Sequence, residues 1–207
     1  MEFLNSHPAL FLIPAAAYLA GSVNFAILVA HLTKTEDLRK KHSGNPGVVN
    51  VYRVMGPGYA VVVLILDVGR AAAVGLAALY FKEPHLAPIV GLALILGNRF
   101  PLFHGFKGGK GVAAYLGFCA VTAPVAAAIS AACWVLVFGV IRIPYIASFF
   151  MIAILAGGGA YYGEFNVTAT VGAAATFGLI VWAHRGNISR HRADRMKSKT
   201  SKKQEES

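Results

Sequence analysis

The chain has 207 residues, of which 57% are apolar and 14% are charged, and its formal net charge is +10. It is too apolar and too poor in charged residues for an ordinary soluble domain, so the composition predicts an integral membrane protein. A basic net charge can also indicate a nucleic-acid-binding protein, but here the basic residues flank apolar segments, which argues against nucleic acid as a partner.

Apolar runs predict about seven membrane helices, so the expected fold is an all-α polytopic membrane protein. The runs cover residues 9–31, 58–81, 86–98, 111–122, 124–141, 144–162 and 167–184. The third and fourth are short, because about 12 residues give roughly 18 Å of helix against a hydrocarbon thickness of roughly 30 Å. They are expected to be short spans, or half-helices that meet at the loop 98–110. Pro124 is expected to separate the fourth helix from the fifth.

The basic residues favour a topology with the N-terminus outside the cell and the C-terminus in the cytoplasm. With about seven crossings, every Lys and Arg except Lys82 and Arg70 falls in a cytoplasmic segment, as the positive-inside rule requires. With six crossings, the basic C-terminal run would lie on the same side as the N-terminus, which carries no Lys or Arg before the first apolar run. The sequence therefore predicts the arrangement with the odd number of crossings.

Residues 1–194 are expected to form a single integral membrane domain. The remaining segment, residues 195–207, is polar and low in complexity, so it is expected to be a disordered basic cytoplasmic tail, held at most by anionic lipid headgroups. Cys119 and Cys133 lie inside apolar runs without metal-type spacing, so neither a disulfide nor a metal site is expected.

The segment SGNPGVVNVYR, which starts at Ser43, is unusually polar for a membrane chain. Gly44 and Gly47 allow the backbone to expose successive N–H groups, and the side chains of Ser43, Asn45 and Asn50 add neutral donors. Such a loop can wrap around an anion. The alternative is an ordinary Asn-Pro-Gly turn.

The segment GNRFPLFHGFKGGKGVA holds Lys107 and Lys110, with Gly108 and Gly109 between them. A helix that starts at Gly111 directs its free N–H groups and the positive end of its dipole toward these lysines. The segment therefore predicts a phosphate site. The alternative, that both lysines only anchor a helix end at the lipid headgroups, explains the charges but not the glycines.

A nucleotide-binding P-loop does not fit the same segment. The pattern G-x-x-x-x-G-K-[ST] would end at Gly109 and Lys110, and it would require a glycine at residue 104 and a hydroxyl at residue 111. The chain has His104 and Gly111 at these positions, so nucleotide hydrolysis is not expected.

The segment HRGNISRHR begins at His184, at the end of the last predicted helix. His184, Asn187 and Arg190 are spaced three apart, so one helical face can present an imidazole, an amide and a guanidinium together. A His at a helix end is more often structural than catalytic. Because two other anion-seeking segments lie on the same predicted side, a shared site is favoured.

Polar residues within the predicted spans have simpler interpretations. Asp67 and Arg70 are three apart and are expected to pair, since burying either charge alone is costly. Ser148 lies about 9 Å of helix beyond Arg142, so it could face a cytoplasmic pocket, or it could be only an interhelical hydrogen-bond donor.

The ordered set of three segments resembles the motifs of the bacterial acyl-phosphate:glycerol-3-phosphate acyltransferases. The matching residues are Ser43-Gly44-Asn45 with Asn50 and Arg53, the stretch FKGGKGVA at 106–113, and His184-x-x-Asn187-Ile188-x-Arg190. The chain departs from the family pattern in having Val48-Val49 where Ala-Thr is typical, and Asn98 where a histidine is common. It also has HRADR in place of an ending with Gly and Glu.

The resemblance implies transfer of an acyl group from acyl phosphate to the 1-hydroxyl of glycerol 3-phosphate, which gives lysophosphatidic acid and phosphate at the first step of phospholipid synthesis. It also implies a multi-pass protein of the bacterial plasma membrane, in contact with membrane lipids, with its site facing the cytoplasm. A monomer is compatible with the sequence. No cofactor or metal is expected, and activity is expected not to depend on added magnesium.

The resemblance also assigns roles to the matching residues. The catalytic residues are Lys110, His184 and Asn187, and the substrate-binding residues are Ser43, Gly44, Asn45, Arg53, Lys107, Gly108, Gly109 and Ser148. No nucleophile with a His–carboxylate pair is evident, so the protein is expected to position the acceptor hydroxyl and to stabilise the developing charge. The alternatives are a transporter or channel for phosphorylated solutes and a lipid-binding scaffold.

Overall fold

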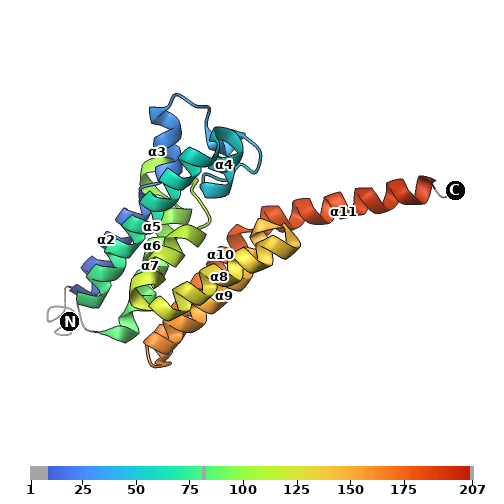
Figure 1. Cartoon of the computed structure of the whole chain (residues 1–207). Helices are drawn as coiled ribbons and strands as arrows, with labels where there is room; N and C mark the ends of the chain where they lie inside the picture. The colour runs from blue at the N-terminus through green and yellow to red at the C-terminus, as the bar shows by residue number, and fades with distance from the viewer. Residues whose placement is uncertain (1–8, 81–82, 206–207) are drawn as a thin grey trace.

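The computed structural model describes residues 9–80 and 83–205, and all regular secondary structure in these two ranges is helical (Figure 1). The α-helices are α2 (Ala9–Ser22), α3 (Phe25–Leu32), α4 (Val48–Met55), α5 (Pro57–Tyr80), α6 (Ala87–Arg99), α7 (Val112–Thr122), α8 (Pro124–Ile141), α9 (Pro144–Tyr162), α10 (Val167–Ala183) and α11 (Arg185–Glu205). Short 3₁₀ turns cover Leu38–Lys40, Pro84–Leu86 and Leu102–His104. The expected all-α class is confirmed for these residues.

Most predicted helix boundaries agree with the structure. From α5 to α10 the bounds lie within one or two residues of those read from the apolar runs. The break at Pro124 is confirmed: α7 ends at Thr122, Ala123 adopts φ −146° and ψ 64°, and α8 begins at the proline. Because proline has fixed φ and no N–H, it suits the first position of a helix.

The first predicted span, residues 9–31, was expected as one helix, but the structure divides it into α2 and α3. The break falls at Val23 and Asn24, and the Asn24 side chain accepts a hydrogen bond from the Ile27 N–H, which caps α3. Arg70 donates to carbonyls at the end of α2. The side chains of Asn24 and Arg70 form hydrogen bonds with backbone groups that the break leaves without partners in a helix. A prediction based on the length of apolar runs does not include such contacts.

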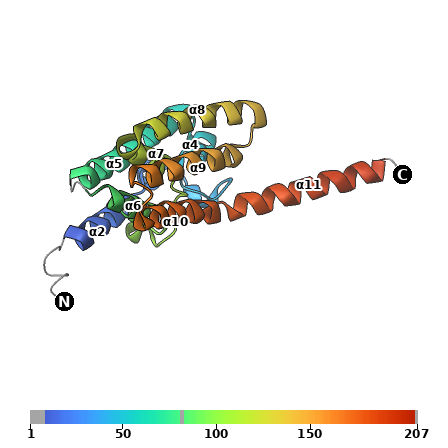
Figure 2. The same ribbon diagram turned by 90° about the horizontal axis from the view of Figure 1, so that it is seen from below.

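The helices form two groups (Figures 1 and 2). In the first group α5 packs against α7 and α2 against α6, and in the second α8 packs against α9, while α10 contacts both α6 and α9. Leu94, Ile95, Phe118, Ile152 and Ile180 are almost completely buried where these helices meet. The two groups therefore share one continuous apolar core.

The outer surface is apolar, as in a membrane protein. On α8, for example, Val125, Ile129, Leu136 and Val140 are all more than half exposed. Five helical segments are long and apolar enough to cross a bilayer, and a sixth would be formed if α10 and the start of α11, bent by 42°, act as one span. The segment around α6, expected to be short, passes this test over Pro84–His104, whereas α7 has only 11 residues.

Two segments differ from the sequence-based description. Residues 48–53, read as part of an anion-binding loop, lie in helix α4, whose amphipathic spacing places Val51 in the interior. Helix α11 extends away from the bundle to Glu205 (Figure 1), although the composition predicts disorder from residue 195. Lys, Arg, Met and Gln are good helix formers, so such a segment can be helical without an apolar face.

Candidate active site

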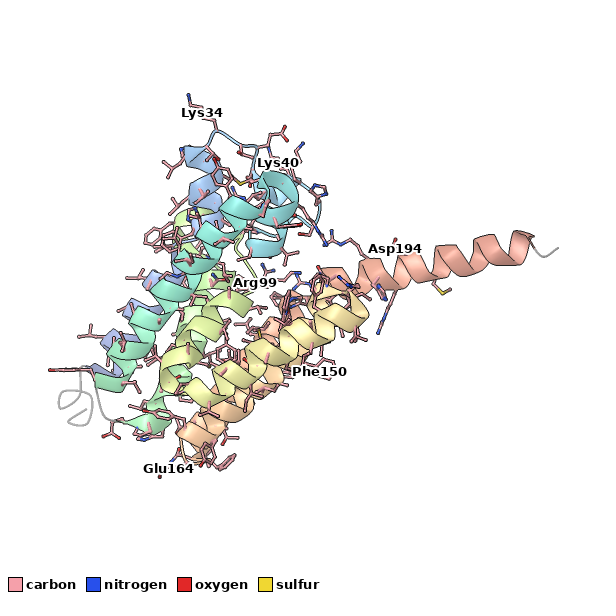
Figure 3. All side chains as sticks on the ribbon, in the orientation of Figure 1. Lys34, Lys40, Arg99, Phe150, Glu164 and Asp194 are labelled. Carbon is pink, nitrogen blue, oxygen red and sulfur yellow. The ribbon has the colours of Figure 1, made fainter. Side chains whose placement is uncertain are left out.

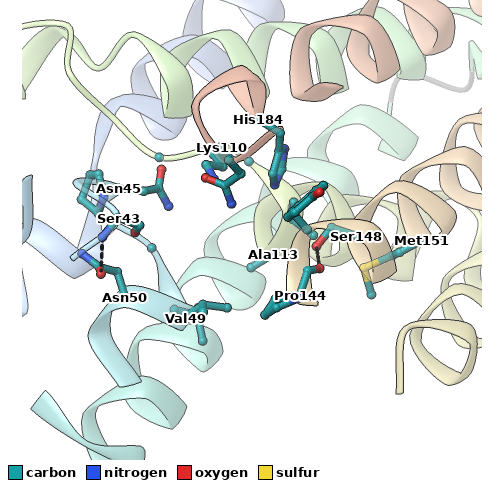
Figure 4. A pocket seen from close by; sticks show the side chains of 18 of the residues that line it. Ser43, Asn45, Val49, Asn50, Lys110, Ala113, Pro144, Ser148, Met151 and His184 are labelled. Carbon is teal, nitrogen blue, oxygen red and sulfur yellow. Dashed lines mark hydrogen bonds between the residues drawn. The ribbon is translucent and has the colours of Figure 1, made fainter. Parts of the chain in front are cut away.

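A pocket of about 760 Å³ opens beside α4, between the start of α7 and the junction of α10 with α11 (Figure 4). Most of the residues predicted from the sequence line it, namely Ser43, Asn45, Arg53, Gly109, Lys110, Ser148, His184 and Asn187. Gly44, Lys107 and Gly108 are not among its lining residues, and Lys107 is exposed. The structure thus brings the three segments together and separates the two lysines.

Lys110 lies in the loop before α7 and directs its side chain into the pocket. Its Nζ donates to Asn187 Oδ1 at 2.7 Å. Burial, and to a smaller extent the nearby charges of Arg190, Arg99 and Arg53, lower the pKa of Lys110 to about 8. A cluster of neighbouring cations favours a bound anion.

The glycines of this loop have a steric role. The Gly108 N–H donates to the Arg99 carbonyl at 3.2 Å, and the Gly109 N–H donates to the Asn98 carbonyl at 3.0 Å. A Cβ atom on Gly108 would lie 2.1 Å from the Asn98 carbonyl oxygen. Both amides are therefore engaged within the protein, and the glycines allow the loop to lie against the end of α6.

The unpaired backbone donors instead come from two helix N-termini. Gly47 and Gly111 are the N-cap residues of α4 and α7, and neither supplies a side chain to the first N–H groups. Gly111 adopts φ +87°, a conformation that favours glycine. First-turn N–H groups lack intrahelical acceptors and carry the positive end of the dipole. The residues from these first turns that line the pocket are Val48, Val49, Val112 and Ala113.

The loop before α4 is held by its own hydrogen bonds. Asn50 is 1% exposed, and its Nδ2 donates to the carbonyls of Leu38 and Lys41 at 2.9 and 3.2 Å. The Ser43 N–H donates to Asn50 Oδ1, and the Gly44 N–H donates to the Lys41 carbonyl. Asn50 therefore shapes the loop, while the Ser43 hydroxyl and the Asn45 amide face the pocket (Figure 4).

Arg190 lines the pocket but was not among the assigned site residues. Its Nη2 donates to the Ser43 carbonyl at 3.0 Å and its Nη1 to the His42 carbonyl at 3.3 Å. The side chain also reaches Asn187 Oδ1 at 3.5 Å. The spacing of three from Asn187 was the available signal, and the structure shows that Arg190 ties α11 to the first loop.

His184 is 3% exposed, and its ring orientation is set by the backbone. Its Nδ1 lies 2.8 Å from the Ile180 carbonyl oxygen, which can only accept, so Nδ1 carries the hydrogen. The neutral ring then has a lone pair on Nε2. Among the side chains described up to Asp194, no carboxylate contacts this imidazole, so the residue is not part of a triad with any of them.

Ser148 connects two helices at the pocket wall. Its hydroxyl donates to the Pro144 carbonyl at 2.9 Å and accepts from Trp134 Nε1 at 3.2 Å. The hydroxyl proton is thus engaged, and one oxygen lone pair is left. Arg53, in contrast, is exposed at the pocket, where it adds to the positive charge around Lys110.

The pocket also has apolar lining residues. They are Leu64 from α5, Leu116 from α7, Trp134 from α8 and Met151 from α9. A single cavity therefore combines cationic and apolar side chains, which fits an amphipathic anion.

Comparisons with known proteins identify the family of the chain. The family model described as glycerol-3-phosphate acyltransferase matches residues 11–194. Curated proteins named glycerol-3-phosphate acyltransferase include one from Myxococcus xanthus, 38% identical over 84% of this chain and 91% of its own. Another, from Pseudomonas aeruginosa, is 35% identical over 86% and 93%.

A crystal structure of PlsY, an integral membrane glycerol 3-phosphate acyltransferase in its glycerol 3-phosphate form, is similar with a TM-score of 0.83. It is 33% identical, over 90% of this chain and 94% of that one. Its lysophosphatidic acid form gives a TM-score of 0.80 at 31% identity, over 90% and 93%. This chain therefore belongs to the glycerol-3-phosphate acyltransferase family of integral membrane enzymes.

Proposed function

We propose that the protein transfers an acyl group from acyl phosphate to the 1-hydroxyl of glycerol 3-phosphate, giving lysophosphatidic acid and phosphate. The observation that carries this proposal is the pocket of about 760 Å³, which is lined by Lys110 and two helix N-termini and also by Leu64 and Met151. The charged lining suits two phosphate groups, and the apolar lining suits a fatty chain.

Lys110 and the first turns of α4 and α7 are placed to bind the donor phosphate. The Lys110 ammonium has three hydrogens, of which Asn187 Oδ1 accepts one. The side chains of Ser43 and Asn45 adjoin the same region. These donors also stabilise the charge that gathers on the departing phosphate.

Arg53, His184 and Asn187 are placed to bind glycerol 3-phosphate, with Ser148 at the wall. The lone pair of His184 Nε2 can accept a hydrogen bond from the 1-hydroxyl and orient it. The hydroxyl oxygen then forms a bond to the acyl carbon, and the bond from that carbon to the phosphate oxygen breaks. The hydroxyl proton passes to the released phosphate. Because acyl phosphate is an activated anhydride, positioning supplies much of the rate.

We also propose that the chain crosses the plasma membrane about seven times, with the N-terminus outside and the pocket open to the cytoplasm. Lys34 and Lys40 lie at the same end of the bundle as Asp194, and Glu164 lies at the other end, which supports this orientation (Figure 3). The pocket is lined by residues from His42 to Asp194, which supports residues 1–194 as one catalytic domain.

The test uses purified full-length protein with acyl phosphate and glycerol 3-phosphate. Phosphate release and lysophosphatidic acid, measured by mass spectrometry, are expected to appear in equal amounts. Reactions without glycerol 3-phosphate, or with an acyl thioester as the donor, serve as controls and are expected to give no lysophosphatidic acid. Uptake of a phosphorylated solute into proteoliposomes, without any product, would instead support transport.

A further inference from the structure

Arg70 connects the two halves of the broken first span. From the middle of α5, its Nη1 donates to the carbonyls of Ala20 at 3.3 Å, Gly21 at 3.1 Å and Val23. Its guanidinium carbon also lies 5.6 Å from the ring centroid of Phe25, the first residue of α3. One side chain therefore contacts the last turn of α2, the break itself and the start of α3.

Asp67 links this arginine to the pocket. Its Oδ1 lies 3.2 Å from Arg70 Nη2, as the spacing along α5 predicts, and both side chains are less than a tenth exposed. Asp67 also lines the pocket. Burying the charges of Asp67 and Arg70 is costly unless other polar groups also bind them. The break between α2 and α3 supplies backbone carbonyls as acceptors for Arg70, whereas in a continuous helix these carbonyls would be bonded within the helix.

Asn24, at the break, contacts both loops that lead into the pocket. Its Nδ2 donates to the Pro46 carbonyl at 3.3 Å, directly before α4, and its backbone N–H donates to His104 Nε2 at 3.4 Å, before α7. Asn24 is 2% exposed. A Cβ atom on Gly109 would lie 3.2 Å from the Pro46 carbonyl oxygen and 3.6 Å from Asn24 Nδ2, so the two loops converge on this amide.

We propose that Arg70, held by Asp67, is a positioning residue for acyl transfer. Arg70 fixes the α2–α3 break and therefore the position of Asn24. The Asn24 residue in turn sets the separation between the loop before α4 and the loop before α7. These loops lead to the two helix N-termini that bind the donor phosphate, so their separation determines whether that phosphate is held at reacting distance from the acceptor hydroxyl. The inference rests on the proposed function.

The experiment measures kcat and KM for both substrates on purified full-length variants. Arg70→Met, which keeps the bulk but removes the donors, is expected to lower kcat/KM by about 100-fold, the scale of a misplaced reacting group. Arg70→Lys is expected to recover part of the loss, because an ammonium can still donate to the same carbonyls. Thr176→Val is the control, since it removes a buried hydroxyl that donates within α10, and wild-type kinetics are expected.

A double-mutant cycle separates positioning from a general loss of stability. If Arg70 acts through Asn24, then Arg70→Lys combined with Asn24→Ala is expected to be no slower than Asn24→Ala alone. This comparison remains available if Arg70→Met does not fold. Additive losses, or a folded Arg70→Met enzyme with wild-type kcat/KM, would overturn the proposal. Inactivity of the wild-type protein would instead count against the proposed function.

Discussion

Lys110 and Asn187 are 77 positions apart in the chain, yet Lys110 Nζ donates to Asn187 Oδ1 at 2.7 Å. The contact joins the start of α7 to the start of α11 across the mouth of the pocket. It leaves two ammonium hydrogens and the Asn187 amide hydrogens directed to the same region. An anion bound there would contact both residues. A substitution of Lys110 is therefore expected to affect the binding of glycerol 3-phosphate, and a substitution of Asn187 the binding of the donor phosphate.

The two lysines of the glycine-rich loop are expected to differ in importance. Lys110→Met is expected to lower kcat/KM by about 100-fold or more, because it removes a charge at the phosphate subsite. Lys107→Met, which alters an exposed side chain outside the pocket, is expected to have an effect below about 10-fold. Equal losses in the two purified variants would contradict the assignment of Lys110 as the phosphate ligand.

Activity is expected to fall as the pH rises through about 8. The pKa of Lys110 is lowered to about 8 by burial and by nearby arginines, and only the charged form binds phosphate well. The decline should appear in kcat/KM, which reports groups of the free enzyme. Lys110→Arg stays charged in this range and is expected to lose the decline. A variant profile that still falls near pH 8 would assign the decline to another group.

The same pKa shift acts in the opposite direction on stability. Between about pH 8 and 10.5 the unfolded chain keeps the Lys110 proton that the folded chain has lost, so this group makes stability rise with pH. Thermal unfolding of the wild type and of Lys110→Met across this range is expected to show a rise that is smaller in the variant.

Arg190 is expected to matter although it is exposed. Arg190→Ala removes hydrogen bonds to the carbonyls of His42 and Ser43, which should loosen the first loop and lower kcat/KM by about 10-fold. Arg192→Ala removes a nearby exposed cation that does not line the pocket, and it is expected to stay within about 2-fold of wild type. A loss of the same size in both variants would point to net charge instead of these contacts.

Gly108→Ala is expected to prevent normal folding. Its Cβ would lie 2.1 Å from the Asn98 carbonyl oxygen and 2.5 Å from Pro101 Cδ, so the backbone must move. Gly157→Ala is the control, because a Cβ at this helical position meets no atom within 4 Å, and it is expected to stabilise α9 by about 0.5–1 kcal/mol. The yield of folded protein and its unfolding temperature in detergent measure both effects.

Helix positions could be predicted because the apolar runs are bounded by proline, glycine or polar residues. The convergence of the three polar segments was inferred from topology and from the family resemblance, and the pocket contains residues from all of them. The α2–α3 break was not predicted. One partner of its free carbonyls is Arg70, whose position in the sequence does not show where its side chain points.

Gly108 and Gly109 were predicted to bind substrate, but their N–H groups donate to carbonyls at the end of α6. A sequence shows that a residue lacks a side chain, yet not which neighbour occupies the vacant space. Arg190 was placed in the third motif but was given no role, since its partners are backbone carbonyls, which a sequence does not display.

The steric role of Gly108 and Gly109 separates what can be changed in this enzyme from what cannot. Randomising these two positions would mostly produce chains that fail to assemble, whatever substrate is offered. Val48 and Val49, by contrast, start a helix at the pocket and do not hold two backbones together. A search for altered substrate preference should therefore vary the start of α4 and leave the glycine-rich loop intact.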